Sequence, residues 1–317
     1  MKGQWVNELA KNGRATGVFK VKEASLKTTR NGKNYIDAAV MDKTGSIACK
    51  IWDAAQAELA KWTPGALVEI KGRVDEYNGR LQLVIDTAVS VDASAVDAGD
   101  FEDTSPIPFD ELKSDFKKLT ETISDAELAA LVKAVLGDRQ VWERFSAWPA
   151  AVQYHHACRH GLLEHTVSML RIAGAIAEST GRVDRDMLLA GCCFHDVGKI
   201  YELTGSTPYD YTDAGRLLGH IYLGARLVAE KAAGLKNFPQ EKIERVLHMV
   251  LAHHGEREFG SPVTPATPEA VALHYIDNVD AKLQAADAAI LRDQTPGAWT
   301  DYLKILETRL FKGRLES

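Results

Sequence analysis

Histidine is the residue type that stands out in this chain, because it occurs ten times and always between positions 155 and 274. Several histidines stand with aspartates at apolar positions of segments with helical spacing, where a lone polar side chain is costly. Imidazole and carboxylate groups suit divalent metals, and one carboxylate can bridge two ions. We therefore expect five helices to bring these polar residues together around shared metal ions. The residues are His165, His195, Asp196, His220, His253, His254, Asp277 and Asp280.

The most specific part of this pattern is the sequence His-Asp-Val-Gly-Lys, which runs from His195 to Lys199. His165 lies thirty residues before it, and a His-His pair and two aspartates follow well after it. A single histidine on an apolar face is more often a satisfied core residue, but the combination predicts a metal site. The spacing leaves open whether one or both histidines of the pair bind metal, and which of the two aspartates does.

The other histidines have simpler interpretations. His248 and His274 lack this context, and we expect them in the core or on the surface. His155, His156 and His160 lie just before the first histidine-bearing helix. They either line the cleft or serve in packing and in the entry to that helix.

Helical periodicity continues through the second half of the chain. No alternation of strands with helices occurs there, so we expect an all-α domain rather than a parallel α/β sheet. A Ser-x-x-Glu pattern at Ser124–Glu127 predicts the start of a helix that ends before Gly137. The five helices that carry the metal candidates are expected within residues 161–180, 184–199, 219–234, 241–254 and 268–290.

The last segment, residues 299–317, also has helical spacing, through Tyr302, Leu306 and Leu310. We expect this segment to pack on the helical body or to meet a neighbouring subunit. A homo-oligomer is therefore an open alternative.

The first ninety residues follow a different pattern, of short alternating or β-branched runs separated by turn signals such as Asn78-Gly79. A helical stretch at residues 54–62 stands between the third run and the fourth. Five strands with a helix at this place are the order of the OB-fold, a barrel that commonly binds single-stranded nucleic acid. The expected strands are residues 17–26, 34–42, 46–53, 66–77 and 80–91.

Aromatic and basic residues of this barrel are candidates for contacts with a single strand, which proteins hold by stacking on its bases and by cationic groups. The alternative is that Trp52 and Tyr77 are core residues of the barrel. The candidate contacts are Arg30, Lys33, Trp52, Tyr77 and Arg80.

Composition and charge divide the chain into parts. With 45% hydrophobic and 26% charged residues it has the balance of a soluble globular protein, which excludes disorder and collagen-like repeats. We find no apolar run of membrane-spanning length, no signal peptide and no Cys-x-x-Cys pair, so we expect a cytoplasmic protein with reduced thiols and no membrane partner. The parts are a mildly basic OB-fold domain at 1–91, an acidic linker and first helix at 92–127, and a near-neutral helical domain at 128–317.

The helical half resembles the HD superfamily of metal-dependent phosphohydrolases, through the motifs GLLEHT, HDVGK, YTDAGRLLGHI, LAHHGE and HYIDNVDAKL. Their spacing after an OB-fold is similar to that of the YhaM-type 3′→5′ exoribonucleases. The resemblance spans residues 13 to 312 and implies an N-terminal all-β OB-fold barrel followed by an all-α HD-domain helical bundle. One departure is His160, which stands where the family pattern leads us to expect a glycine.

The resemblance also implies a function. The enzyme would hydrolyse single-stranded RNA, or single-stranded DNA, from the 3′ end and release nucleoside 5′-monophosphates. It would use two divalent ions, with Mn²⁺ expected and Fe, Co²⁺ or Mg²⁺ as alternatives. Asp196 would bridge the ions and Lys199 would contact the scissile phosphate, which makes these two the catalytic candidates. The implied metal ligands are His165, His195, Asp196, His220, His253 or His254, and Asp277.

Two other functions compete with this one. The first is an HD phosphohydrolase that acts on a small nucleotide or cyclic dinucleotide, with the barrel as a regulatory or oligomerisation module. The second is a non-catalytic RNA-binding adaptor with a structural metal site. The second is disfavoured, because structural metal sites rarely need six or more ligands and a lysine.

Overall fold

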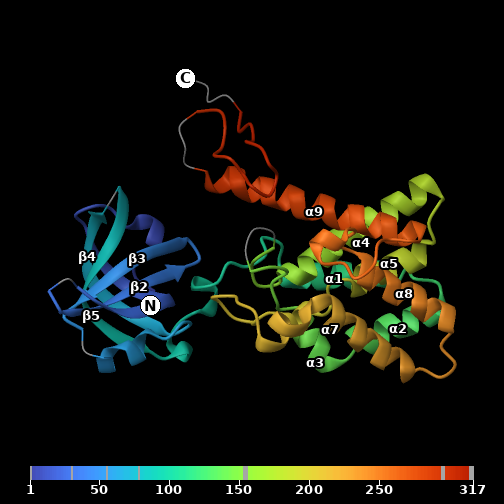
Figure 1. Cartoon of the computed structure of the whole chain (residues 1–317), viewed down its shortest axis with the longest axis horizontal. Helices are drawn as coiled ribbons and strands as arrows, with labels where there is room; N and C mark the ends of the chain where they lie inside the picture. The colour runs from blue at the N-terminus through green and yellow to red at the C-terminus, as the bar shows by residue number, and fades with distance from the viewer. Residues whose placement is uncertain are drawn as a thin grey trace. The chain divides into compact units, whose positions relative to one another are not determined.

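The computed structural model describes residues 2–29, 31–54, 56–77, 79–152, 156–293 and 297–313. The chain forms two compact units, of which the first is Met1–Thr104 with Ser206–Pro208 and the second is Ser105–Gly205 with Tyr209–Ser317. The first unit contains the strands and the second contains the α-helices (Figure 1). The predicted class, a β-barrel followed by an all-α bundle, is confirmed.

The barrel closes in the strand order β1-β2-β3-β5-β4. Neighbouring strands are antiparallel except for the pair β3 and β5. A 3₁₀ helix, η2 (Gln56–Trp62), lies between β3 and β4, where the sequence predicts a helix. This topology is that of the OB-fold. The strands are β1 (Arg14–Thr28), β2 (Asn34–Asp42), β3 (Gly45–Trp52), β4 (Leu67–Tyr77) and β5 (Arg80–Val91).

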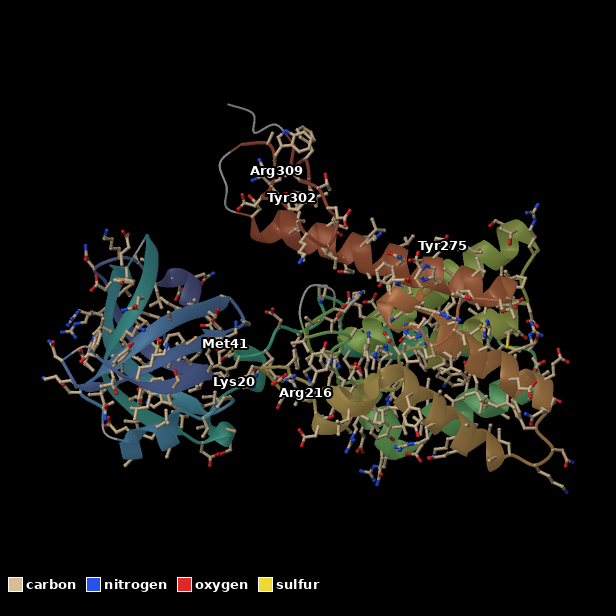
Figure 2. The ribbon with its side chains drawn as sticks, viewed as in Figure 1. Lys20, Met41, Arg216, Tyr275, Tyr302 and Arg309 are labelled. Atoms are coloured by element: carbon tan, nitrogen blue, oxygen red, sulfur yellow. The ribbon has the colours of Figure 1, made fainter. Side chains whose placement is uncertain are left out.

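Strand β1 closes the barrel because it pairs with two neighbours in succession. Its first half pairs with β4 and its second half with β2; the change comes at Lys20, whose β2 partner is Met41 (Figure 2). A register shift follows directly in β1, and another in β4 precedes Gly72. A Cβ on Gly72 would lie 2.4 Å from the carbonyl oxygen of Val84, so the barrel requires glycine there. Such irregularities bend strands enough to close a sheet on itself.

The second unit packs its helices around α4 and α5. Helix α5 is buried on every side from Met187 to Phe194, and a helix that is apolar all round belongs in a core. The end of α5 therefore delivers the residues that follow it into the middle of the unit. The helices are α1 (Phe109–Thr120), α2 (Ala126–Leu136), α3 (Arg139–Phe145), α4 (Gly161–Thr180), α5 (Arg185–Phe194), α6 (Lys199–Glu202), α7 (Asp213–Ala233), α8 (Gln240–Ala252) and α9 (Pro268–Arg292).

Helix α7 is kinked at Gly219, whose positive φ of 70° is accessible to glycine without a Cβ clash. The sequence predicts a helix from Gly219 onward, and the structure adds a first segment from Asp213. A new helical segment begins at His220, and the first N–H groups of a helix have no partner within it. The backbone N–H of His220 donates instead to Glu202 Oε1, at 3.0 Å.

Two predicted features of the second unit are wrong. Helix α2 is capped by Asp125, which accepts from the Leu128 N–H, rather than by Ser124. Ser124 instead donates its N–H and its hydroxyl to Asp186. The helix predicted over 184–199 is split into α5 and α6, and the sequence prediction omits α3.

The segment after α9 has helical spacing but does not form a helix. Residues 297–313 form isolated β-bridges, Trp299 with Phe311 and Leu303 with Thr308. Asp293, at the end of α9, accepts from the Asp301 N–H and pairs with Lys312, which draws the segment back on itself. Residues 314–317 lie outside the described residues. Among the helices that the structure describes, none has the length and apolar character to span a membrane.

A close contact between backbones holds α6 against α7. A Cβ on Gly198 would lie 2.0 Å from the carbonyl oxygen of His220 and 2.5 Å from the N of Gly224. Gly198 directly precedes Lys199, so this contact sets where Lys199 lies. Glycine is needed at position 198 for space alone, since its φ of −66° is open to any residue.

We predict that Gly198→Ala destabilises the helical unit by ~1–3 kcal/mol, the usual cost of forcing extra atoms into a packed interior. The control is Gly174→Ala in α4, where an added Cβ meets nothing within 4 Å and alanine stabilises a helix by roughly 0.5–1 kcal/mol relative to glycine. Urea unfolding followed by circular dichroism measures both changes. Equal midpoints for the two variants would contradict the role assigned to Gly198.

Candidate metal centre

The structure brings the predicted metal ligands together in the second unit. All but His254 and Asp277 are buried, and those two are partly buried. They are His165 in α4, His195 and Asp196 after the end of α5, His220 in α7, His253 and His254 after the end of α8, and Asp277 in α9.

One group of donor atoms, which we name the first donor set, surrounds Nε2 of His165. This atom lies 3.1 Å from His195 Nε2 and 3.3 Å from Asp277 Oδ1. It is also 3.7 Å from Asp196 Oδ2, which in turn lies 3.3 Å from His195 Nε2. Two imidazoles and two carboxylates are a donor set suited to a divalent metal ion.

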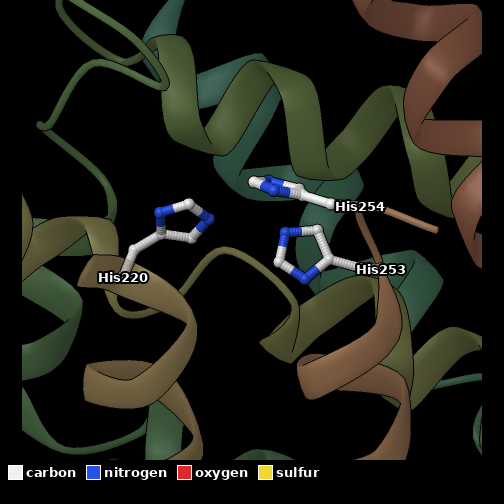
Figure 3. A group of neighbouring side chains, drawn as sticks. All are labelled: His220, His253 and His254. Carbon is white, nitrogen blue, oxygen red and sulfur yellow. The ribbon is translucent and has the colours of Figure 1, made fainter. Parts of the chain in front are cut away.

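The other oxygen of Asp196, Oδ1, faces a second donor set. It lies 3.5 Å from His220 Nε2 and 3.6 Å from His253 Nε2. The His254 ring is 5.1 Å from the His220 ring and 4.4 Å from the His253 ring, and Figure 3 shows the three imidazoles gathered around one space. Asp196 thus presents one oxygen to each set, so it could contribute a ligand to an ion in both.

Three atoms of the second donor set are buried polar atoms without a hydrogen bond. Within the part of the chain that the structure describes, four buried side-chain nitrogen or oxygen atoms lack a partner, and three are Asp196 Oδ1, His220 Nε2 and His253 Nε2. Each such atom costs ~1–3 kcal/mol if it stays unpaired. Because these three face one another, a single cation that binds carboxylate oxygen and imidazole nitrogen would satisfy them all. The residues therefore fit a divalent metal ion.

Backbone carbonyls fix the orientation of three of the histidines. Nδ1 of His195 lies 3.0 Å from the Cys192 carbonyl oxygen, and Nδ1 of His253 lies 2.8 Å from that of Val250. Nδ1 of His254 contacts the carbonyl of Phe259. A carbonyl oxygen can only accept, so Nδ1 carries the hydrogen in each ring and Nε2 presents its lone pair. This is the tautomer that a metal ligand needs.

The two aspartates of α9 have different surroundings. Asp277 belongs to the first donor set. Asp280 accepts hydrogen bonds at both of its oxygens: Oδ2 from His165 Nδ1 at 2.7 Å and from His156 Nε2 at 2.9 Å, and Oδ1 from the Ser168 hydroxyl. Because Asp280 already accepts three hydrogen bonds and Asp277 Oδ1 faces the first donor set, the geometry favours Asp277 as the ligand.

The charges of the site are arranged to hold a cation. Burial by itself raises the pKa of Asp196, but Lys199 and His195 lower it well below its usual range. Burial lowers the pKa of His165, but the carboxylates of Asp277 and Asp280 outweigh it and raise that pKa to about 10. The first donor set is therefore a place of strongly negative potential.

The second donor set is electrostatically different. Burial, reinforced by His254, holds the pKa of His253 well below its usual range, and burial with His220 lowers the pKa of His254. Both rings are therefore neutral at neutral pH, with lone pairs available for a metal. Lys199 lies 2.6 Å from Asp196 Oδ2; burial lowers its pKa, but Asp196 raises it further, so Lys199 is a cation at the edge of the centre.

A cavity of about 1070 Å³ opens onto the centre. Lys199, His220, His254 and Asp277 all contribute to its wall, so both donor sets face it. The rest of the wall comes from α6, α9 and the segments around them, and it includes Glu202, Tyr211, Phe259, Asn278, Lys282 and Ile305.

The remaining predicted histidines lie in other surroundings. His155 falls outside the described residues, and His156 binds Asp280. His160 has a left-handed backbone with φ of 66°, which explains why a glycine is expected there. Its ring contacts the Ser146 carbonyl and stacks on Phe109, so it serves in packing. Neither His248 nor His274 belongs to a donor set: the first accepts from the Ala266 N–H, and the second contacts the His253 carbonyl.

Two of the nucleic-acid candidates of the barrel fall outside the described part of the chain. Arg30 does so entirely, and Arg80 does so with its side chain. Trp52 is 49% exposed and Tyr77 is 68% exposed, so neither is a core residue. The Trp52 ring packs at 5.0 Å against that of Tyr35. Lys33 is exposed and pairs with Asp53 at 3.1 Å. The structure thus places two accessible aromatic rings on the barrel.

Sequence reasoning missed one residue of the site altogether. Glu202 lies on α6 and is buried; its Oε1 is 2.9 Å from Nδ1 of His220. The signal that points to it is weak, a glutamate three residues after Lys199 at the end of a short apolar run. His156 was considered only for packing or for the cleft wall, and its contact with Asp280 depends on a long-range approach of α4 and α9.

Comparison with known proteins agrees with this division of the chain. A family model described as the HD domain matches residues 162–282, and one described as an OB-fold nucleic acid binding domain matches residues 18–90. The HD match implies dependence on a divalent metal.

Whole-length relatives carry the same name. The 3′-5′ exoribonuclease YhaM of Bacillus subtilis is 36% identical over 294 residues, which are 92% of this chain and 92% of the relative. Those of Geobacillus and Listeria monocytogenes are each 34% identical, over 92% and 94% of this chain and 89% and 95% of the relative.

We predict that His253→Ala, which removes one ligand of the second donor set, weakens binding of Mn²⁺ to chelator-stripped protein. The loss should exceed the ~10–100-fold that follows from removing a group that only supports a ligand. Calorimetric titration measures it. His248→Ala, in the same helix, is the matched control and should bind like the unmodified protein. Equal affinity in the two variants would rule out His253 as a ligand.

Proposed function

The chain belongs to the 3′-5′ exoribonuclease YhaM family, and we propose that it hydrolyses single-stranded RNA from the 3′ end and releases nucleoside 5′-monophosphates. On this proposal the OB-fold domain at residues 1–91 binds the strand, residues 92–127 connect, and the helical domain at residues 128–317 cuts. The RNA substrate comes from the relatives, and single-stranded DNA is the competing substrate to test.

The observation that carries the proposal is the buried carboxylate of Asp196, which presents one oxygen to each of two donor sets at the wall of a large cavity. This is an arrangement for two ions that act on one phosphate. A structural metal site has four ligands and is closed, whereas this centre has seven candidate ligands and faces a cavity.

We propose two divalent ions with Mn²⁺ as the native metal. Imidazole nitrogen supplies five of the seven candidate ligands and carboxylate oxygen the other two. Imidazole suits transition metals such as Fe better than Mg²⁺, and the two carboxylates suit Mn²⁺. Bound there, such ions lower the pKa of water and neutralise phosphate oxygens. Asp196 and Lys199 are the catalytic residues of this proposal.

Lys199 supports hydrolysis with a fixed positive charge. Its ammonium lies 2.6 Å from Asp196 Oδ2 and contributes to the cavity wall, so a phosphate held at the centre would contact it. A donor that is already in place stabilises the negative charge that builds up in the transition state without further reorganisation. Its pairing with Asp196 and the Gly198 contact hold it there.

The size of the cavity favours the end of a polymer over a free nucleotide. Most small-molecule pockets have volumes of ~300–1,000 Å³, and this one lies at the upper end of that range, at about 1070 Å³, which leaves room for more than one nucleotide. Lys282 and Asn278 also belong to its wall and offer a cation and an amide to further phosphates or bases.

A cytoplasmic location and a homo-oligomeric state complete the proposal. The four cysteines are free, as in a reducing compartment. Exposed apolar side chains on α9 and the segment after it, among them Tyr275 and Tyr302 (Figure 2), offer a surface for a second copy of the chain.

The deciding experiment follows single-stranded RNA labelled at its 5′ end over time. With Mn²⁺ we expect a ladder of products shortened stepwise from the 3′ end, and with excess chelator no shortening. Asp196→Ala should abolish hydrolysis, because it removes a donor from both sets, and should leave RNA binding by gel shift nearly intact.

Three results would contradict the proposal: full activity of Asp196→Ala, activity that persists in chelator, or rapid hydrolysis of free nucleotides with intact RNA. Faster shortening of the matched DNA strand would replace RNA by DNA as the substrate.

We predict that Trp52→Ala and Tyr77→Ala each weaken binding of single-stranded RNA, because each removes an exposed ring on which a base can stack. Stacking contributes ~1–3 kcal/mol per base, which is roughly 5- to 150-fold in the dissociation constant. Val89→Ala, which shortens an exposed aliphatic side chain of the barrel, is the control and should bind normally. Unchanged affinity in both aromatic variants would exclude the Trp52 and Tyr77 rings as the surface on which bases stack.

A further inference from the structure

Two buried carboxylates outside the donor sets hold one histidine each. Asp280 accepts from Nδ1 of His165, at 2.7 Å, and His165 presents its other nitrogen to the first donor set. Glu202 accepts from Nδ1 of His220, at 2.9 Å, and His220 presents its other nitrogen to the second. Both carboxylates are less than one-tenth exposed. Each donor set thus contains one histidine that is held by a carboxylate.

The position of each histidine in its helix explains this difference. His195 and His253 follow the last residues of α5 and α8, where the final carbonyls of a helix have no partner within it. Their Nδ1 atoms use those carbonyls. His165 lies within α4, where the carbonyls accept from the next turn, and His220 starts a helical segment, where N–H groups rather than carbonyls are unpaired. These two need an acceptor from another element.

Both carboxylates are themselves fixed. Asp280 also accepts from His156 and from the Ser168 hydroxyl, which lies one turn from His165 on α4. Glu202 Oε1 accepts from the backbone N–H of His220 as well as from its ring. A Cβ on Gly215 would lie 2.2 Å from the Glu202 carbonyl oxygen, so α7 packs directly on the backbone of this residue. Neither carboxylate can turn away without breaking several contacts.

We propose that Asp280 and Glu202 are positioning residues, each serving one metal: Asp280 the ion of the first donor set through His165, and Glu202 the ion of the second through His220. This inference rests on the proposed two-metal function. Each carboxylate sets the tautomer of its histidine and makes the ring a stronger ligand, as outer partners of metal-binding histidines do. The two metal affinities are then separately adjustable.

The test is calorimetric titration of chelator-stripped full-length protein with Mn²⁺. Asp280→Asn and Glu202→Gln keep the shape of the side chain and remove its charge. We expect each to weaken one of two binding events by ~10–100-fold and to leave the other within twofold. Ser168→Ala, which removes a hydrogen bond to Asp280 without touching a ligand, should cause a smaller loss in the same event as Asp280→Asn.

Histidine variants identify which event belongs to which set. In a His220→Ala background, Asp280→Asn should still weaken the remaining event and Glu202→Gln should change nothing further. In a His165→Ala background the pattern should reverse. The absorption spectrum of bound Co²⁺ in each single variant should change for one equivalent only, which loss of stability alone would not produce.

The proposal fails if each substitution weakens both events equally, if neither changes an affinity by more than twofold, or if the unmodified protein does not bind two ions. A protein that binds two ions and shows the expected pattern, but leaves RNA intact, overturns the proposed function and supports the positioning roles.

Discussion

The buried carboxylate of Asp196 is the interaction on which the rest of the structure depends. A charge taken out of water costs several kcal/mol unless it is paired, and removal of one partner of a buried pair is strongly destabilising. Lys199 compensates one oxygen, whereas the other faces His220 and His253 of the second donor set. The helical core therefore surrounds a carboxylate whose charge its own residues compensate only in part. A cation bound at the site would compensate the rest.

The ends of helices supply the hydrogen-bonding groups that stabilise this arrangement inside the core. The unit places His195 and His253 after the C-termini of α5 and α8, where unpaired carbonyls orient the rings. It breaks α7 at Gly219, which creates an unpaired N–H at His220 for Glu202 to accept. The same breaks in the helices that would weaken an ordinary core thus supply the hydrogen-bonding groups of this one. The rings of His165, inside α4, and of His220 are each held by a carboxylate from another element.

Local patterns in the sequence were sufficient to predict the strands, the main helices and the group of residues at the centre. This is because alternation, periodicity and His-Asp spacing are local properties. The wrong predictions concern competition between distant groups. Ser124 binds Asp186, sixty-two residues away, and Asp125 caps α2 in its place. The segment after α9 has helical spacing, but its bonds to Asp293 draw it into β-bridges. Glu202 was missed because nothing near it in the chain marks its contact with His220.

The choice between Asp277 and Asp280 shows most clearly where sequence reasoning ends. Residues three apart on a helix point roughly 60° apart, so both aspartates face the same side of α9 and no pattern separates them. The number of hydrogen-bond donors that reach each aspartate is what separates the two. Asp280 receives three donors on its two oxygens, whereas Asp277 Oδ1 faces the atoms that a cation would share. A carboxylate that already accepts from a histidine orients that ring, and this difference between the two aspartates exists only once α4 and α9 have packed together.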